Sequence, residues 1–424
     1  MLMLWRIEAC EMIFLSTTPP DEEILDYYCS IMPERSEDIR RRFHHVSIPD
    51  MSARSIAAKA LDSPEILDQI AKMIGARPAF IEPWNVTDYE VAVAMRLGVP
   101  IVGTDPKLWP IGFKSAGRKL IREAGVPVPA GREDVKTVED VLAAIEAVRA
   151  ERPAAPGVVV KLDNSGAGDG NIVLRFADVI SSSGDGMWSR VASMPDWFLE
   201  ELRAGGIVEE LITGERFTSP SVQVDVTPAA DVAVLATHEQ VLGGESAQVY
   251  TGCRFPADPS YAPELARHGR LVGERLAREG VLGRLAIDFA VATSRSGSSD
   301  VYALEMNLRK GGTTHPYAAL RNLVPGRYDE EAGRWVSNED GTPRWYRSTD
   351  NLVDESWVGL PPAVVIRAVA DAGLQFDPRT GSGVVLHMLS SLAIDGRFGL
   401  TAIGRTPEEA EELYEGTAGA IPAP

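Results

Sequence analysis

The segment from Val301 to Pro316, VYALEMNLRKGGTTHP, constrains the fold of this chain more than any other. Its first half alternates apolar side chains with a period of 2, which predicts a β-strand. On that strand Glu305 and Asn307 point to the same face, about 7 Å apart. A buried carboxylate beside a buried amide is costly unless a cation lies between them, and oxygen ligands at this spacing suit Mg²⁺ that carries a nucleotide phosphate. Positive charge follows where the strand ends, at Arg309 and Lys310.

A second strand is predicted from Leu285 to Thr293, LAIDFAVAT, before a polar turn at 294–300. The two strands would form a β-hairpin in which Asp288 faces Glu305 across the pair. Together with Asn307 they would make a three-oxygen metal site. The alternative is that the two acidic residues are ordinary edge-strand carboxylates, and the adjacent amide and cations favour the metal site.

These residues resemble a known family. The DF dipeptide of one strand and the EMNLR segment of the next are similar to the metal-binding hairpin of the ATP-grasp superfamily, which includes biotin carboxylase and D-alanine ligases. The longer string EMNLRKGGTTHP resembles the pheganomycin-type peptide ligases more narrowly. The likeness extends from about Glu11 to Tyr414 and leaves residues 1–10 unmatched. It implies an α/β (α+β) ATP-grasp fold, with an N-terminal parallel α/β domain and antiparallel sheets that sandwich the nucleotide.

Composition limits the other options. The chain has 424 residues, a formal charge of −19 and a pI near 4.9, which argue against binding to nucleic acid or to an anionic membrane. Three widely spaced cysteines fit neither a disulfide framework nor a zinc knuckle, so we expect a cytoplasmic protein. No apolar run reaches the ~18 residues that span a bilayer. The oligomeric state stays open, with a homodimer as one option.

The N-terminal region alternates predicted strands and helices up to about Gly103, which indicates a small parallel α/β sheet. Its strands are predicted at 12–16, 43–48, 78–81 and 99–103. A dinucleotide site is not expected there, because no G-x-G-x-x-G follows the first strand.

A basic helix is predicted from Lys114, closed by Gly125. The pattern alone favours a solvated helix on which Lys114, Arg118 and Lys119 face water. In ATP-grasp enzymes, however, a lysine that opens such a helix contacts nucleotide phosphates, and the resemblance assigns that role to Lys114.

Two further strands, 158–162 and 172–176, flank the loop NSGAGDGN. Glycines let backbone N–H groups approach phosphate oxygens, and Lys161 adds a charge at the strand end. The loop is not a P-loop, since no G-x-x-x-x-G-K-[ST] occurs in the chain. Alone it indicates a flexible turn, but it lies where the resemblance places the second ATP-grasp lysine and the phosphate-covering loop. The predicted loop contacts are Ser165, Gly166, Gly168 and Gly170.

A helix at 187–204 and a strand at 207–213 are predicted next. The resemblance implies that this strand is the hinge that recognises adenine, with Glu209, Glu210 and Ile212 at the matching positions; from the pattern alone the glutamates would form an exposed strand edge. His238 and Arg254, on later strands, are candidates for the acceptor pocket, and His315 is a third substrate candidate. Lone residues of this kind are more often structural.

The end of the chain is predicted to contain a polar surface insert at 325–351, a helix at 363–372, a β-hairpin with a turn at Gly396, and a last helix from Pro407. The expected parts are an N-terminal α/β domain, a small ATP-grasp subdomain, a large subdomain with the metal site, and a C-terminal α/β segment. Their boundaries are 1–110, 111–205, 206–350 and 351–424.

The resemblance implies a carboxylate–amine ligase in peptide natural-product (antibiotic) biosynthesis. ATP would phosphorylate a donor carboxylate, and an amine would attack the acyl phosphate to give an amide, ADP and phosphate. Mg²⁺ at the three-oxygen site would neutralise the transferring phosphoryl, with Lys114, Lys161 and the catalytic candidates Arg309 and Lys310 nearby. The implied donor is an amino acid or guanidino acid, and the implied acceptor is the amine of an amino acid or peptide. Alternatives are a small-molecule phosphotransferase and a non-catalytic nucleotide-binding regulator.

Overall fold

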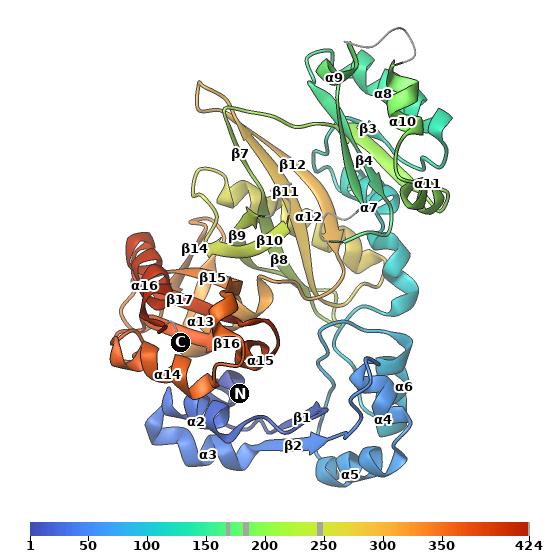
Figure 1. The fold of residues 1–424 in the computed structure, drawn as a ribbon. Helices are drawn as coiled ribbons and strands as arrows, with labels where there is room; N and C mark the ends of the chain where they lie inside the picture. Colours follow the sequence, from blue (N-terminus) through green and yellow to red (C-terminus); the bar gives the residue numbers. More distant parts are fainter. Residues whose placement is uncertain (167–169, 181–185, 244–248, 423–424) are drawn as a thin grey trace. The chain divides into compact units, whose positions relative to one another are not determined.

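The computed structural model describes residues 1–166, 170–180, 186–243 and 249–422 (Figure 1). The chain forms two compact units. The first unit comprises 1–106, 251–256 and 309–424, and the second comprises 107–250 and 257–308. The four-part division expected from the sequence stays a prediction.

The N-terminal part of the first unit is built on a parallel pair of strands, β1 (Met12–Ser16) and β2 (Phe43–Ser47). Helices α2 (Glu22–Ser30) and α3 (Ser36–Arg42) connect them, because two parallel strands need a crossover connection rather than a tight turn. Helices α4 (Ile56–Leu61), α5 (Pro64–Ile74) and α6 (Asp88–Leu97) follow. Their apolar faces pack around a core that includes Val46, Ile48, Leu67 and Ile70.

The prediction of two more parallel strands was wrong in their length but not in their parallel pairing. Segments 78–81 and 99–103 meet only at an isolated parallel bridge between Ile81 and Ile101. Each segment offers only a few residues between a proline and a turn, because Pro78 opens one and Pro100 interrupts the other. Proline cannot donate to a ladder, so a longer strand does not form.

The C-terminal part of the first unit is an antiparallel sheet with β15 (Pro343–Val353) inside it. β15 pairs with β17 (Arg397–Gly404), with β14 (Arg334–Ser337) and with the 253–255 end of β10 (Val249–Phe255). At the two sides, β13 (Gly326–Asp329) pairs with β14 and β16 (Gly383–His387) pairs with β17. Helices α13 (Thr314–Leu323), α14 (Pro362–Asp371) and α16 (Pro407–Ala420) complete this part.

This sheet corrects the expectation of a surface insert at 325–351. The segment supplies β13, β14 and most of β15, and its Trp335 and Tyr346 are buried. The prediction took its polar residues as a sign of exposure. Arg344 and Ser348 are instead buried, each with a hydrogen-bond partner. The predicted hairpin after it is present as β16 and β17, with Gly396 in the left-handed region at φ 68° directly before β17.

The smaller sheet of the second unit has the antiparallel order β3 (Gly131–Arg132), β6 (Gly206–Glu210), β4 (Gly157–Leu162) and β5 (Asn171–Arg175). Helix α8 (Val138–Glu151) packs on it through Val141, Ile145 and Val148. The single helix predicted at 187–204 is two helices, α10 (Gly186–Ala192) and α11 (Asp196–Leu202). Pro195 separates them, because proline lacks the N–H that a continuous helix would use there.

The larger sheet of the second unit runs in the order β12 (Ser299–Asn307), β11 (Gly283–Thr293), β8 (Pro220–Val226) and β9 (Val232–Gly243), and β7 (Arg216–Thr218) also pairs with β11. Helix α12 (Ala262–Arg278) covers β8 and β9, and helix α7 (Lys114–Glu123) lies against β12. Among the described residues, none of the helices has the length and the apolar character needed to cross a bilayer.

Candidate functional site

The predicted hairpin is confirmed, and its register sets two carboxylates opposite each other. β11 and β12 pair antiparallel with Asp288 across from Glu305, next to an irregularity at Asp288 and Phe289. Asn307 Nδ2 donates to Asp288 Oδ2 at 3.0 Å. Gln240, on β9, donates from Nε2 to Asp288 Oδ1 at 2.7 Å. The structure thus brings together the three residues predicted as metal ligands, and it adds Gln240, which the sequence pattern did not single out.

This donor set fits Mg²⁺. Asp288 and Glu305 offer hard carboxylate oxygens from neighbouring strands, and Asn307 offers an amide oxygen, which is the ligand chemistry that Mg²⁺ prefers. Half a turn of the Asn307 amide would bring its Oδ1 to the position where Nδ2 now meets Asp288. These residues could therefore hold Mg²⁺ together with phosphate oxygens of a nucleotide.

Lys114 links the metal strand to the Gly-rich segment. It is the first residue of α7 and only 6% exposed. Its Nζ lies 3.3 Å from Glu305 Oε2 and donates to the carbonyl oxygen and to Oγ of Ser165, at 2.8 and 3.1 Å. A buried ammonium is thus held between a predicted metal ligand and the predicted phosphate-covering loop.

The described glycines of that loop differ in the room that each leaves for a side chain. A Cβ added at Gly170 would lie 2.3 Å from Ser165 Oγ, so this position requires glycine. Gly166 has open space around its Cα. Gly168 lies outside the described residues.

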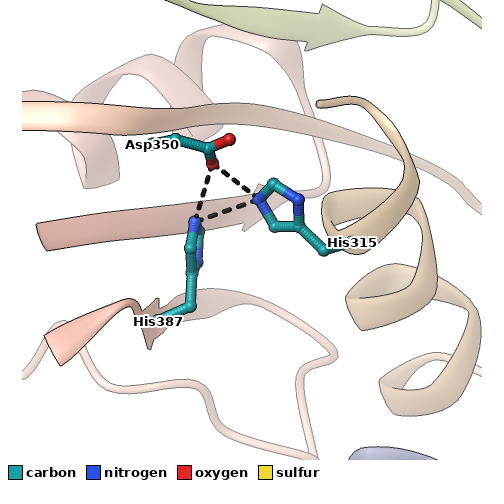
Figure 2. Close-up of side chains that lie close together, drawn as sticks. All are labelled: His315, Asp350 and His387. Atoms are coloured by element: carbon teal, nitrogen blue, oxygen red, sulfur yellow. Dashed lines mark hydrogen bonds and ion pairs between the residues drawn. The ribbon is translucent and has the colours of Figure 1, made fainter. Parts of the chain in front are cut away.

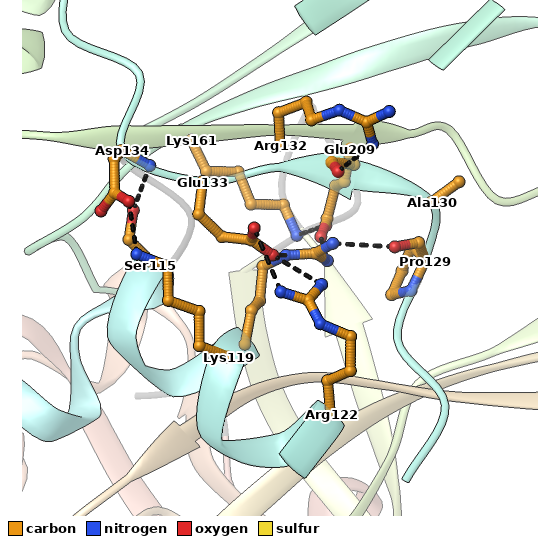
Figure 3. Close-up of polar contacts among 12 residues, drawn as sticks. Ser115, Lys119, Arg122, Pro129, Ala130, Arg132, Glu133, Asp134, Lys161 and Glu209 are labelled. Carbon is orange, nitrogen blue, oxygen red and sulfur yellow. Dashed lines mark hydrogen bonds and ion pairs between the residues drawn. The ribbon is translucent and has the colours of Figure 1, made fainter. Parts of the chain in front are cut away.

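The predicted adenine hinge is buried and charged (Figure 3). Glu209 and Glu210 are 2% and 9% exposed, which rules out the exposed strand edge. Glu209 forms ion pairs with Lys161 and with Arg118, whose Nη1 lies 2.7 Å from Glu209 Oε2. Glu210 Oε1 accepts from the backbone N–H of Ala130 at 2.8 Å. Ile212 follows directly after β6 and is half-buried.

Arg118 corrects the picture of a solvated basic helix. Its guanidinium is fully buried and donates to Glu133 Oε1 at 3.1 Å and to the carbonyl of Pro129 at 2.8 Å, besides Glu209. Burial alone would raise the pKa of Glu133, but Arg122 and Arg118 outweigh that effect and lower it. Only Lys119, whose side chain is 43% exposed, behaves as the solvated face predicted.

The remaining predicted site residues have contacts with residues other than the predicted metal ligands. His238 lies on β9 with 0% exposure, and burial lowers the pKa of His238 to about 3. Three others belong to the first unit. Arg254 pairs with Glu411 through Nε and Nη2 at 3.0 Å each, Lys310 Nζ lies 3.0 Å from Glu82, and Arg309 Nη1 donates to the carbonyl of Lys310.

His315, also in the first unit, belongs to a cluster that the sequence did not predict (Figure 2). Its Nε2 lies 2.7 Å from Asp350 Oδ1 and 3.0 Å from His387 Nε2. His387 Nε2 and Asp350 Oδ1 are 3.1 Å apart. The three residues come from segments more than 30 positions apart, so no local pattern could have connected them.

Comparison with known proteins gives the family. Residues 188–322 match the family described as IQCH-like, ATP-grasp, and residues 364–417 match the PGM1 C-terminal domain. The chain is 30% identical over 417 residues to the L-propargylglycine–L-glutamate ligase of Streptantibioticus cattleyicolor, a match that covers 96% of this chain and 84% of that protein.

Solved structures share the fold. The biotin carboxylase domain of Hydrogenobacter thermophilus 2-oxoglutarate carboxylase, determined with MgADP, ADP and bicarbonate, matches with a TM-score of 0.57 at 15% identity, over 95% of this chain and 89% of that one. N5-carboxyaminoimidazole ribonucleotide synthetase from Thermus thermophilus matches with a TM-score of 0.53 at 16% identity, over 98% and 93% of the chains. The fold and the identity to the ligase over most of both chains show that this chain belongs to the ATP-grasp family of carboxylate–amine ligases, whose cofactors are ATP and Mg²⁺.

Proposed function

We propose that this ligase joins the carboxylate of an amino acid or guanidino acid to the amine of an amino acid or peptide, through an acyl phosphate. The similar ligase is named for joining two amino acids, which supports amino acids as both donor and acceptor. We further propose that the reaction takes place in the cytoplasm, as a step of peptide natural-product biosynthesis.

The observation that carries the proposal is the position of Lys114. Its buried ammonium lies between Glu305 and Ser165, which supports the proposal because these residues belong to the proposed metal site and to the proposed phosphate-covering loop. A carboxylate is a poor electrophile, and phosphorylation turns one of its oxygens into a leaving group. The protein's task is then to stabilise charge on the transferring phosphoryl, for which no side-chain nucleophile is needed.

We assign each of the charged residues at the proposed site a part in this reaction. Asp288, Glu305 and Asn307 would hold Mg²⁺, which would supply positive charge to offset that of the phosphates. Lys114 binds a phosphate oxygen in place of Ser165, and Lys161 turns from Glu209 toward the phosphates. Glu209, still held by Arg118, keeps the hinge strand in place for adenine.

Arg309 is assigned to the transferring phosphoryl because a guanidinium can grip two of its oxygens at once. Lys310 is already paired with Glu82, so we give it a supporting role in setting the local charge.

The test is incubation of the protein with ATP, Mg²⁺ and a library of amino acids and dipeptides, with mass detection of products. Ligation gives an amide, ADP and phosphate. A phosphorylated small molecule instead would favour the phosphotransferase, and no ATP-dependent product with any substrate pair would favour the regulator.

Glu305→Gln tests the metal site within that assay. The variant keeps the shape of the side chain and removes its charge, so kcat should fall more than tenfold, a loss above about 1.4 kcal/mol of transition-state stabilisation. Asp300→Asn is the matched control, because Asp300 is an exposed carboxylate on the same strand, β12, and should leave turnover unchanged. Equal turnover of the two variants would remove Glu305 from the metal site.

A further inference from the structure

His315, Asp350 and His387 direct one atom each toward a common point (Figure 2). The atoms are two imidazole Nε2 nitrogens and one carboxylate oxygen, at mutual separations of 2.7, 3.0 and 3.1 Å. They come from the first turn of α13, from β15 and from the end of β16, all within the first unit. Among the described residues, this is the only such group of three histidine, cysteine or acidic side chains.

Hydrogen bonds alone cannot satisfy this arrangement. Each Nε2 carries at most one proton, and both protons would have to point at the same carboxylate oxygen. The two nitrogens would still lie 3.0 Å apart with no proton between them. If one proton were instead placed between the nitrogens, one contact with Asp350 would lose its donor. A cation at the common point would satisfy all three atoms at once.

We propose that His315, Asp350 and His387 form a binding site for a divalent transition-metal ion such as Zn²⁺. Zinc binds imidazole nitrogen and carboxylate oxygen at about 2.0–2.2 Å, and a tetrahedral site spaces such atoms about 3.3 Å apart. To reach that spacing, the three separations would need to grow by about 0.2–0.6 Å. Imidazole ligands select zinc, copper, nickel or iron and disfavour Mg²⁺ and Ca²⁺, so this site would not compete for the nucleotide metal.

Neighbouring residues hold the ligands in place. A hydrogen bond joins the His387 ring to the backbone of Thr349, and such outer contacts orient metal-binding histidines. A Cβ added at Gly399 would lie 2.2 Å from His387 Nε2, so only glycine leaves room for the ring beside β17. The side chains of His315, Asp350 and His387 are 27%, 30% and 16% exposed, which leaves access for an ion and for water as a fourth ligand.

The metal would cross-link three segments that are distant in the sequence. His315 lies in the first turn of α13, shortly after Arg309. A bound ion would fix that turn to β15 and β16 and so restrict the segment 309–314. The expected role is therefore structural, because the three ligands tie together elements that share no covalent connection nearby.

The test uses full-length protein without a histidine tag, stripped with a chelator and dialysed against Zn²⁺, with the bound metal measured by elemental analysis. We expect about one equivalent per chain. Co²⁺ in place of Zn²⁺ should give the visible absorption of a nitrogen- and oxygen-coordinated ion. Competition with a chromophoric chelator then gives the affinity, and Mg²⁺ in large excess should not displace the ion.

The variants are His387→Gln, His315→Gln and Asp350→Asn, with His44→Gln as the matched control. His44 also pairs with a carboxylate, Glu11, in the same unit but belongs to no such group of three among the described residues. Each ligand variant should weaken Zn²⁺ binding roughly 100-fold or more, since loss of an outer partner alone costs about 10–100-fold. The control should bind like the parent protein. Binding well below one equivalent by the unaltered protein, or equal affinities of the ligand variants and the control, would overturn the proposal.

Discussion

Arg118→Ala should destabilise the second unit strongly, because it removes a buried cation with three acceptors. The guanidinium is fully buried and contacts Glu209 at 2.7 Å, the carbonyl of Pro129 at 2.8 Å and Glu133 at 3.1 Å. Removal of one member of a buried ion pair costs about 3–5 kcal/mol, because the partner's charge stays buried without compensation. Lys161 still pairs with Glu209 in the variant, which places the expected loss near the lower end of that range.

The matched control is Arg122→Ala, one turn later on the same helix. Arg122 also contacts Glu133, at 3.0 Å, but its side chain is 52% exposed. Exposed ion pairs contribute about 0.2–1 kcal/mol, so the control should cost no more than that. The structure therefore predicts a difference of at least about 2 kcal/mol between two arginines that share a partner.

Thermal unfolding measures this difference. For a unit of about 200 residues, 1 kcal/mol corresponds to about 2–4 °C in Tm, so Arg118→Ala should lower Tm by roughly 6–12 °C and Arg122→Ala by less than about 4 °C. The KM for ATP should rise in Arg118→Ala but not in the control, because Glu209 lies on the strand proposed to recognise adenine. Equal Tm shifts in the two variants would refute the argument that burial sets the contribution of Arg118.

Three further predictions concern Lys161, Arg309 and His238. Lys161→Ala should reduce ADP formation steeply while competition by adenosine changes little, and unchanged ADP release at saturating substrate would mean that Lys161 has no part in phosphate binding. Arg309→Lys should keep ATP affinity within a few-fold but reduce amide formation by roughly two to three powers of ten, and unimpaired ligation would exclude this role. Burial lowers the pKa of His238 from 6.5 to about 3. As the pH drops below 6.5, the unfolded chain therefore binds a proton at His238 that the folded chain does not bind, and the free energy of unfolding falls. Between pH 7 and pH 5 this costs roughly 2 kcal/mol, and His238→Gln should show a correspondingly shallower dependence of unfolding free energy on pH; identical slopes would contradict it.

The strand pair that carries the predicted metal ligands could be predicted from the sequence because its signal is local. A period of 2 fixes which side chains share a face, and the turn after β11 fixes the register, so Asp288 opposite Glu305 followed from the pattern. The Lys114 helix and the two strands that flank the Gly-rich segment, β4 and β5, were also found at their predicted places. The family resemblance supplied what these patterns mean chemically.

Burial of charge could not be predicted in the same way. The pattern of α7 shows a basic face but not what covers it, and the carboxylates that pair with Arg118 lie 15 and 91 positions away. The same reason hid Gln240, which reaches Asp288 from a strand 48 positions earlier. The segment 325–351 was misread because the charged and polar residues of β15 have buried partners.

The fate of the donor's oxygen tests the central claim most directly. Once a donor and an acceptor are known, the donor carboxylate is labelled with ¹⁸O on both oxygens, and the products of one reaction with ATP and Mg²⁺ are analysed by mass. Ligation through an acyl phosphate predicts one ¹⁸O in the released phosphate, one in the amide, and none in ADP. Unlabelled phosphate, or ¹⁸O recovered in AMP, would contradict the account.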